Sequence, residues 1–113
     1  MQIEVSDAGD NLRKVMLIPR LDTASVLGIE TKFVTALVPG GKSAIVDLSQ
    51  VDFIASMGIR MFISVARIMR DKHAKLVFYA PQQMVDQVLE SASFRKIVPV
   101  CADATEAVTV VQG

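Results

Sequence analysis

The sequence is poor in the residues that build metal, disulfide and catalytic sites. Its 113 residues include one cysteine, Cys101, one histidine, His73, and no tryptophan. A lone cysteine excludes an intrachain disulfide, and a zinc site of the ordinary Cys/His kind needs about four such ligands. We find no glycine-rich phosphate loop and no nucleophile–base pair in the sequence. We therefore expect a protein without catalytic residues, cofactor or metal.

The sequence also lacks a net charge of either sign and lacks long apolar runs. Twelve basic residues balance twelve acidic ones, so bulk charge favours neither nucleic acid nor an anionic membrane as a partner. No apolar run approaches the roughly 20 residues of a transmembrane helix, and the first ten residues lack the pattern of a secretory signal. Hydrophobic residues make up 51% of the chain, which predicts a folded protein. The single cysteine favours a cytoplasmic location.

Strand and helix patterns alternate along what we interpret as one domain, residues 1–113. Ile3 and Val5 alternate with polar residues, which is typical of an edge strand, and residues 7–11 carry a turn signal. Further strands are expected at residues 14–18, 44–48, 74–80 and 96–101, and helices at residues 23–38 and 57–71, from Pro81 and from Asp103. The order predicts an α/β fold with a mostly parallel or mixed sheet.

Short polar residues mark several element boundaries. Asp22 or Thr23 caps the first helix, and Asp103 with Glu106 resembles a capping box before the last one. Asp47 ends a buried strand, where its carboxylate is expected to close the following turn.

The helix over residues 57–71 has three faces on a helical wheel. One is a polar stripe that includes Arg60, and the opposite one is a broad core face. Met57, Met61 and Ile68 form an apolar flank between them, with two interpretations. The flank is either the margin of a wide core or an exposed strip that fits a partner surface or a second copy of the chain.

Ser56 stands immediately before this helix and also has two interpretations. A serine there caps free backbone N–H groups and stabilises the helix by about 1 kcal/mol. A phosphate on the same hydroxyl would also be favoured, because a helix N-terminus carries partial positive charge. Arg60 lies one turn on, within reach of such a phosphate.

Residues 44–79 resemble the core of the STAS domain family, the anti-sigma factor antagonists. Asp47-Leu48-Ser49 match the family's Asp-Leu-Ser run, Ser56 falls on its phosphorylatable serine, and Gly58 on the following glycine. Residues 19–25, 80–100 and 103–108 are similar to further family segments, so the resemblance covers nearly the whole chain.

The resemblance implies a mixed sheet of four or five strands with about four helices, mainly on one face. It implies an anti-sigma factor antagonist that acts without catalysis. Its partner is an anti-sigma factor that is also a histidine-kinase-like serine kinase. Phosphorylation of Ser56 by the kinase ends the complex, and a phosphatase resets it. The implied partner surface consists of Asp22, Thr23, Ser56, Met57, Gly58, Arg60 and Met61.

Two residues depart from the family pattern around the serine. Ala55 replaces an aspartate and Met57 replaces a second serine, so both neighbours of Ser56 are apolar. This leaves a second function open: a constitutive STAS subunit of a stressosome-like scaffold or a regulatory partner of an ABC-transporter ATPase. In that case Ser56 is only a helix cap and the apolar strip is a permanent interface.

Overall fold

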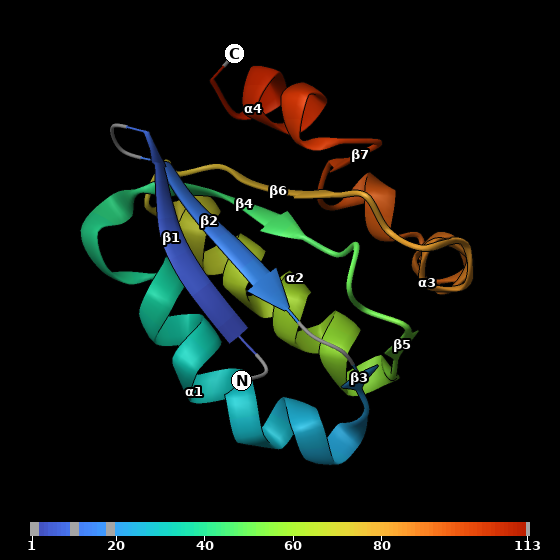
Figure 1. Ribbon diagram of the computed structural model, residues 1–113. Helices are drawn as coiled ribbons and strands as arrows, with labels where there is room; N and C mark the ends of the chain where they lie inside the picture. Colours follow the sequence, from blue (N-terminus) through green and yellow to red (C-terminus); the bar gives the residue numbers. More distant parts are fainter. Residues whose placement is uncertain (1–2, 10–11, 18–19, 113) are drawn as a thin grey trace.

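A five-stranded mixed sheet lies at the centre of the computed structural model, which describes residues 3–9, 12–17 and 20–112 (Figure 1). The strand order is β1-β2-β4-β6-β7. The edge strand β1 (Ile3–Gly9) runs antiparallel to β2 (Leu12–Leu17). The strands β2, β4 (Ser43–Asp47), β6 (Leu76–Tyr79) and β7 (Val100–Cys101) are parallel. The predicted mixed α/β fold is therefore confirmed.

Helices cover both faces of the sheet unequally. Figure 1 shows α1 (Thr23–Leu37) and α2 (Ser56–Asp71) on one face and α4 (Ala104–Gln112) on the other. The third helix, α3 (Gln83–Ser91), contributes its buried residues to the core beneath α1 and α2. Four phenylalanine rings pack in contact at the centre of this larger core, namely Phe33, Phe62, Phe78 and Phe94.

The alternation of side chains along the strands fills both cores. In β4, Val46 joins the larger core, whereas Ile45 faces α4. In β6, Phe78 and Tyr79 divide in the same way. Cys101 is buried in the smaller core, as predicted, and burial raises the pKa of its thiol.

Several sequence-based boundaries are corrected by the structure. The strand expected at residues 96–101 is only β7, because residues Phe94–Lys96 form the 3-10 helix η2. The third helix begins at Gln83, two residues beyond Pro81. The strand expected at residues 14–18 begins earlier, at Leu12, and Ile18 lies outside the described residues, as do Asp10 and Asn11 of the expected turn.

A second, two-stranded sheet was not expected. It pairs β3 (Arg20–Leu21) with β5 (Phe53–Ile54) in parallel. A short 3-10 helix, η1 (Pro39–Gly41), follows α1 where the sequence predicts its end. Within the described part of the chain, no helix combines the length and the apolar character needed to cross a membrane.

Candidate functional site

The small β3/β5 sheet brings the starts of α1 and α2 together. Its register pairs Arg20 with Phe53 and Leu21 with Ile54, and each helix begins two residues after its strand (Figure 1). The Ala55 N–H extends the pairing by donating to the Leu21 carbonyl at 2.8 Å. Two helix N-termini, each with partial positive charge, therefore lie at one end of the molecule.

The start of α1 is capped by a carboxylate. Asp22 has an extended backbone, and its Oδ1 accepts a hydrogen bond from the Ser25 N–H at 2.8 Å. This bond lowers the pKa of Asp22 below its usual 3.8, and Arg20 adds an ion pair at 3.6 Å. The prediction that Asp22 or Thr23 caps this helix is confirmed for Asp22. Thr23 is the first helical residue and is exposed.

The start of α2 differs from the prediction. The N-cap residue is Ala55, which has no side-chain oxygen to bond the free N–H groups, and Ser56 is the first helical residue. The Ala55 carbonyl accepts from the Gly58 N–H at 2.9 Å. Ala55 is held extended by its bond to β3, so the N-cap falls on Ala55 and the helix begins at Ser56, one residue earlier than the sequence suggests. The prediction that Ser56 is the helix cap is therefore wrong.

The Ser56 hydroxyl is left on the surface by this arrangement. The residue is exposed, and no hydrogen bond joins its hydroxyl to another residue in the described ranges. The free N–H groups of the first turn of α2 surround it, and Arg60 is exposed one turn further on. A phosphate at this hydroxyl would lie beside donors and positive charge.

Gly58 belongs to the scaffold of the site. It is buried, and a Cβ atom on it would lie 3.0 Å from Ile54 Cγ1 and 3.4 Å from Leu21 Cβ. Glycine is needed here because α2 packs closely against the β3/β5 sheet. Its place in the predicted partner surface is thus limited to setting the position of the Ser56 turn.

In the apolar flank of α2, the structure changes the interpretation of one residue, Met61. Met61 is only 3% exposed and joins the core, so of the two interpretations the core margin holds for Met61 and the exposed strip is wrong for it. The reason is that α1 packs alongside this flank. Met57 is half-buried and Ile68 is 40% exposed. A groove of about 180 Å³ remains between the helices, lined by Glu30, Val34, Met57, Arg60, Met61, Ser64, Val65 and Ile68.

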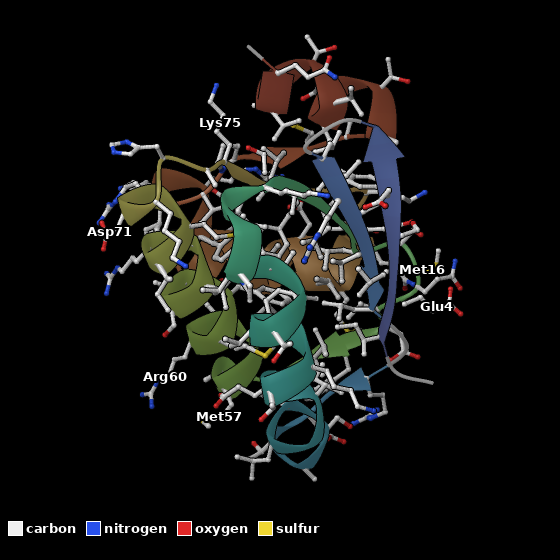
Figure 2. All side chains as sticks on the ribbon, turned by 90° about the vertical axis from the view of Figure 1, so that its left-hand side faces the viewer. Glu4, Met16, Met57, Arg60, Asp71 and Lys75 are labelled. Carbon is white, nitrogen blue, oxygen red and sulfur yellow. The ribbon has the colours of Figure 1, made fainter. Side chains whose placement is uncertain are left out.

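The polar stripe of α2 lies where the wheel placed it. The stripe consists of Arg60, Ser64, Arg67 and Asp71, and all four are exposed. Figure 2 shows Met57 and Arg60 on α2 beside α1. Met61 therefore contributes the floor of the groove, while Met57 and Arg60 contribute its rim at the Ser56 end.

Two residues of this surface were missed by the sequence analysis. The guanidinium carbon of Arg20 lies 4.5 Å from the centre of the Phe53 ring, and Arg20 also pairs with Asp22. Phe53 is 36% exposed, which is unusual for a large aromatic side chain. Periodicity could not find them, because each stands in a strand of only two residues, where Arg20 and Phe53 point to the side opposite the buried Leu21 and Ile54.

The strand end at Asp47 has a structural role. The Asp47 carboxylate accepts from the Ser49 N–H at 2.8 Å, which confirms the predicted turn. Burial, followed by the nearby Asp47 charge, raises the pKa of Tyr79 to about 12. In the described ranges, no group of three or more His, Cys, Asp or Glu residues is placed to hold a metal ion.

Comparison with known proteins identifies the domain. The STAS domain family matches residues 7–107. The chain is 29% identical over 87 residues to BtrV of Bordetella bronchiseptica, which is named as an anti-sigma factor antagonist; the match covers 77% of this chain and 74% of the relative.

Solved structures share the fold. The crystal structure of an anti-sigma factor antagonist from Thermotoga maritima superposes with a TM-score of 0.88 at 16% identity, covering 98% of this chain and 95% of the other. The phosphorylated form of SpoIIAA, a cell fate determinant of Bacillus, gives 0.72 at 18% identity, covering 96% and 98%. From the family match over most of its length and from this shared fold, the chain belongs to the STAS domain family.

Proposed function

We propose that the protein is an anti-sigma factor antagonist that binds an anti-sigma factor with histidine-kinase-like serine kinase activity. In this proposal the partner covers the surface around the start of α2, made by Asp22, Thr23, Ser56, Met57 and Arg60. Gly58 and Met61 support that surface from beneath. Phosphorylation of Ser56 by the partner ends the complex, and a phosphatase restores it.

The observation that carries the proposal is the exposed Ser56 hydroxyl at the first position of α2. A kinase can reach it without unfolding the helix, because neither burial nor a hydrogen bond to a described residue holds it. The positive end of the helix dipole and Arg60 accommodate the added phosphate within the fold. The relatives named above as anti-sigma factor antagonists support the same class of partner.

The physics of the switch lies in the surroundings of Ser56. Met57 is half-buried beside it and Phe53 is partly exposed on the neighbouring strand, so a partner docks on a partly apolar surface. A phosphate adds about −1.5 to −2 charges there. A bound partner would have to desolvate that charge next to apolar atoms, and the complex is therefore weakened.

The direct test is phosphorylation in solution. The purified protein is incubated with ATP and a candidate anti-sigma kinase chosen from the neighbouring genes, and its intact mass is measured. We expect one added phosphate on the wild type and none on Ser56→Ala. Absence of phosphate on the wild type, or its retention on the variant, contradicts the role of Ser56.

Binding of the same partner is then measured by calorimetry. Ser56→Asp is expected to weaken binding tenfold or more, about 1.4 kcal/mol, whereas Ser56→Ala binds like the wild type. Ser91→Asp is the matched control, because Ser91 is an exposed serine at the end of α3. Equal binding by Ser56→Asp and the wild type would favour the alternative, a constitutive STAS subunit in a larger assembly.

A further inference from the structure

A second concave site lies at the opposite end of α2 from Ser56. It has a volume of about 360 Å³ and is bounded by the last turns of α2, the start of β6, the segment before β7, and α4. The 16 residues of α2 rise over about 24 Å, so this cavity is separate from the proposed partner surface. Its lining is Ala66, Arg67, Arg70, Ala74, Lys75, Leu76, Val77, Ile97, Val98, Pro99 and Val110.

The cavity exists because the edge strand β7 is too short to cover β6. The pairing of the two strands begins at Phe78 with Val100, so the first half of β6 has no strand beside it on that edge. The Phe78 N–H donates to the Pro99 carbonyl at 3.1 Å, and the preceding step of the ladder would need an N–H at residue 99. Proline has none, so the pairing stops there.

This interruption leaves both the N–H and the C=O of Leu76 facing the cavity. The Lys75 carbonyl accepts from the Ala44 N–H on the β4 side, and the Phe78 N–H points to the β7 side. Because successive residues alternate, the N–H and C=O of Leu76 face the β7 side as well. Leu76 lines the cavity, and its register position has no partner in β7.

The lining separates into a positive part and an apolar part. Arg67, Arg70 and Lys75 bring three cationic side chains from the end of α2 and the start of β6, and no acidic residue lines the cavity. Arg70 makes a 3.9 Å contact with Asp71, but both side chains are about three-quarters exposed, so that pair is weak. Figure 2 shows Asp71 at the end of α2 opposite Met57 and Arg60, and Lys75 on the side toward α4.

The apolar part comes from the segment before β7 and from α4. Ile97 is 44% exposed and Val110 is 37% exposed, and both line the cavity. A concave surface lined by apolar side chains together with a few polar groups is typical of a ligand site. An occupant that satisfies the whole lining carries a negative head group and a hydrocarbon tail.

We propose that this cavity binds a free medium-chain fatty acid. The carboxylate lies near Arg67, Arg70, Lys75 and the Leu76 N–H, and the chain lies along Ile97, Val98 and Val110. The volume is near the lower end of the roughly 300–1,000 Å³ of small-molecule pockets, which fits one short acyl chain. The proposal concerns a function separate from partner binding at Ser56 and does not depend on it.

The test follows backbone amide signals of the full chain by NMR while sodium decanoate is added below its micelle concentration. We expect saturable shifts at the amides of residues 67, 70, 75, 76, 97 and 110, with little change around Ser56. Decyltrimethylammonium, which has the same chain and the opposite charge, is expected to give no saturable shifts at these amides.

Variants assign the charge and the chain separately. Replacing both arginines, Arg67→Gln with Arg70→Gln, is expected to weaken decanoate binding tenfold or more, and the uncharged change Val110→Asn is expected to weaken it as well. Lys96→Gln is the matched control, since Lys96 is exposed beside Ile97 but does not line the cavity. All three are surface changes, and a native amide spectrum without ligand establishes that each variant is folded.

Three results would overturn the proposal. The first is the absence of saturable shifts with decanoate. The second is equal binding of the cationic analogue, which would remove the role of the arginines and Lys75. The third is that decanoate shifts the groove between α1 and α2 in place of the amides named above.

Discussion

The helices α1 and α2 begin side by side but are built differently. At the start of α1, the Asp22 carboxylate bonds the Ser25 N–H and pairs with Arg20. At the start of α2, Ala55 offers no side-chain partner, and the first turn carries the exposed Ser56. One helix start is thus closed by its own side chain, and the other keeps donors available to an outside group.

The two helices also differ in their glycines. Gly28 of α1 is exposed, and a Cβ atom there would meet nothing within 4 Å. Gly58 of α2 is buried against Ile54 and Leu21. The turn of α1 at Gly28 thus faces open space, whereas the first turn of α2 packs tightly against the β3/β5 sheet. A tightly held turn presents Ser56 in one position.

The largest expected effect comes from separating α1 and α2. Met61→Glu places a carboxylate in the buried contact between them, and we expect a loss of about 4 kcal/mol in the free energy of unfolding. Met57→Glu, at the half-buried rim of the groove, is expected to cost about 1 kcal/mol or less. Urea unfolding followed by circular dichroism measures both.

Met61→Ala extends that experiment if the glutamate variant does not fold. It is expected to cost about 2–3 kcal/mol, as for other buried methionines. A Met61→Glu protein as stable as the wild type would mean that the side chain lies outside the core and that the exposed-strip interpretation is correct.

A medium effect is expected from the glycine pair. Gly58→Val forces two γ-methyl groups into the contact with Ile54, and we expect it to lower the free energy of unfolding by about 2 kcal/mol. Gly28→Val is the matched change on α1 and is expected to stay within about 0.5 kcal/mol of the wild type. Similar unfolding midpoints for the two variants would show that the start of α2 is not closely packed.

The smallest expected effect comes from making the two helix starts alike. Ala55→Asp supplies the missing cap of α2 and is expected to raise the free energy of unfolding by about 1 kcal/mol at pH 7. The cap bond lowers the folded-state pKa of such a carboxylate, as it does at Asp22. The charge-dependent part of the gain is therefore present above about pH 4 and lost as the pH falls further.

Ala55→Asn separates the cap from its charge, because an asparagine cap does not titrate in this range. It is expected to stabilise at both pH 7 and pH 3, measured by urea unfolding. If neither variant stabilises the protein, the first turn of α2 already has partners for its N–H groups, and the contrast with α1 would be incorrect.

Much of the fold followed from periodicity and from the resemblance to the STAS family. Val26, Ile29, Phe33 and Leu37 recur at helical spacing in residues 23–38, and all four are buried in α1. Ile45 and Val46 lie in a continuous apolar run, as expected for a strand covered on both faces. These patterns depend only on the spacing of neighbouring residues, so a single sequence is enough to predict such helices and strands.

The details of the site were less predictable. Serine is a common helix-cap residue, so Ser56 was expected to cap α2. The bond from the Ala55 N–H to the Leu21 carbonyl, which joins residues more than thirty positions apart, places the cap at Ala55 instead. On the helical wheel, Met61 lies in the flank between the polar stripe and the core face. It is buried only because α1 packs against that flank. Arg20 and Phe53 each lie in a two-residue strand, too short for a period to be read.

The sequence by itself determined the class of the domain, the order of the four helices and of the strands of the main sheet, and the serine at the start of α2, because these depend on residue type and local spacing. The tertiary structure decided which side chains around Ser56 are exposed, that Ala55 is the N-cap, and that Pro99 leaves a cavity beside β6. The physical reason is that burial and hydrogen-bond partners are set by contacts between segments distant in the chain.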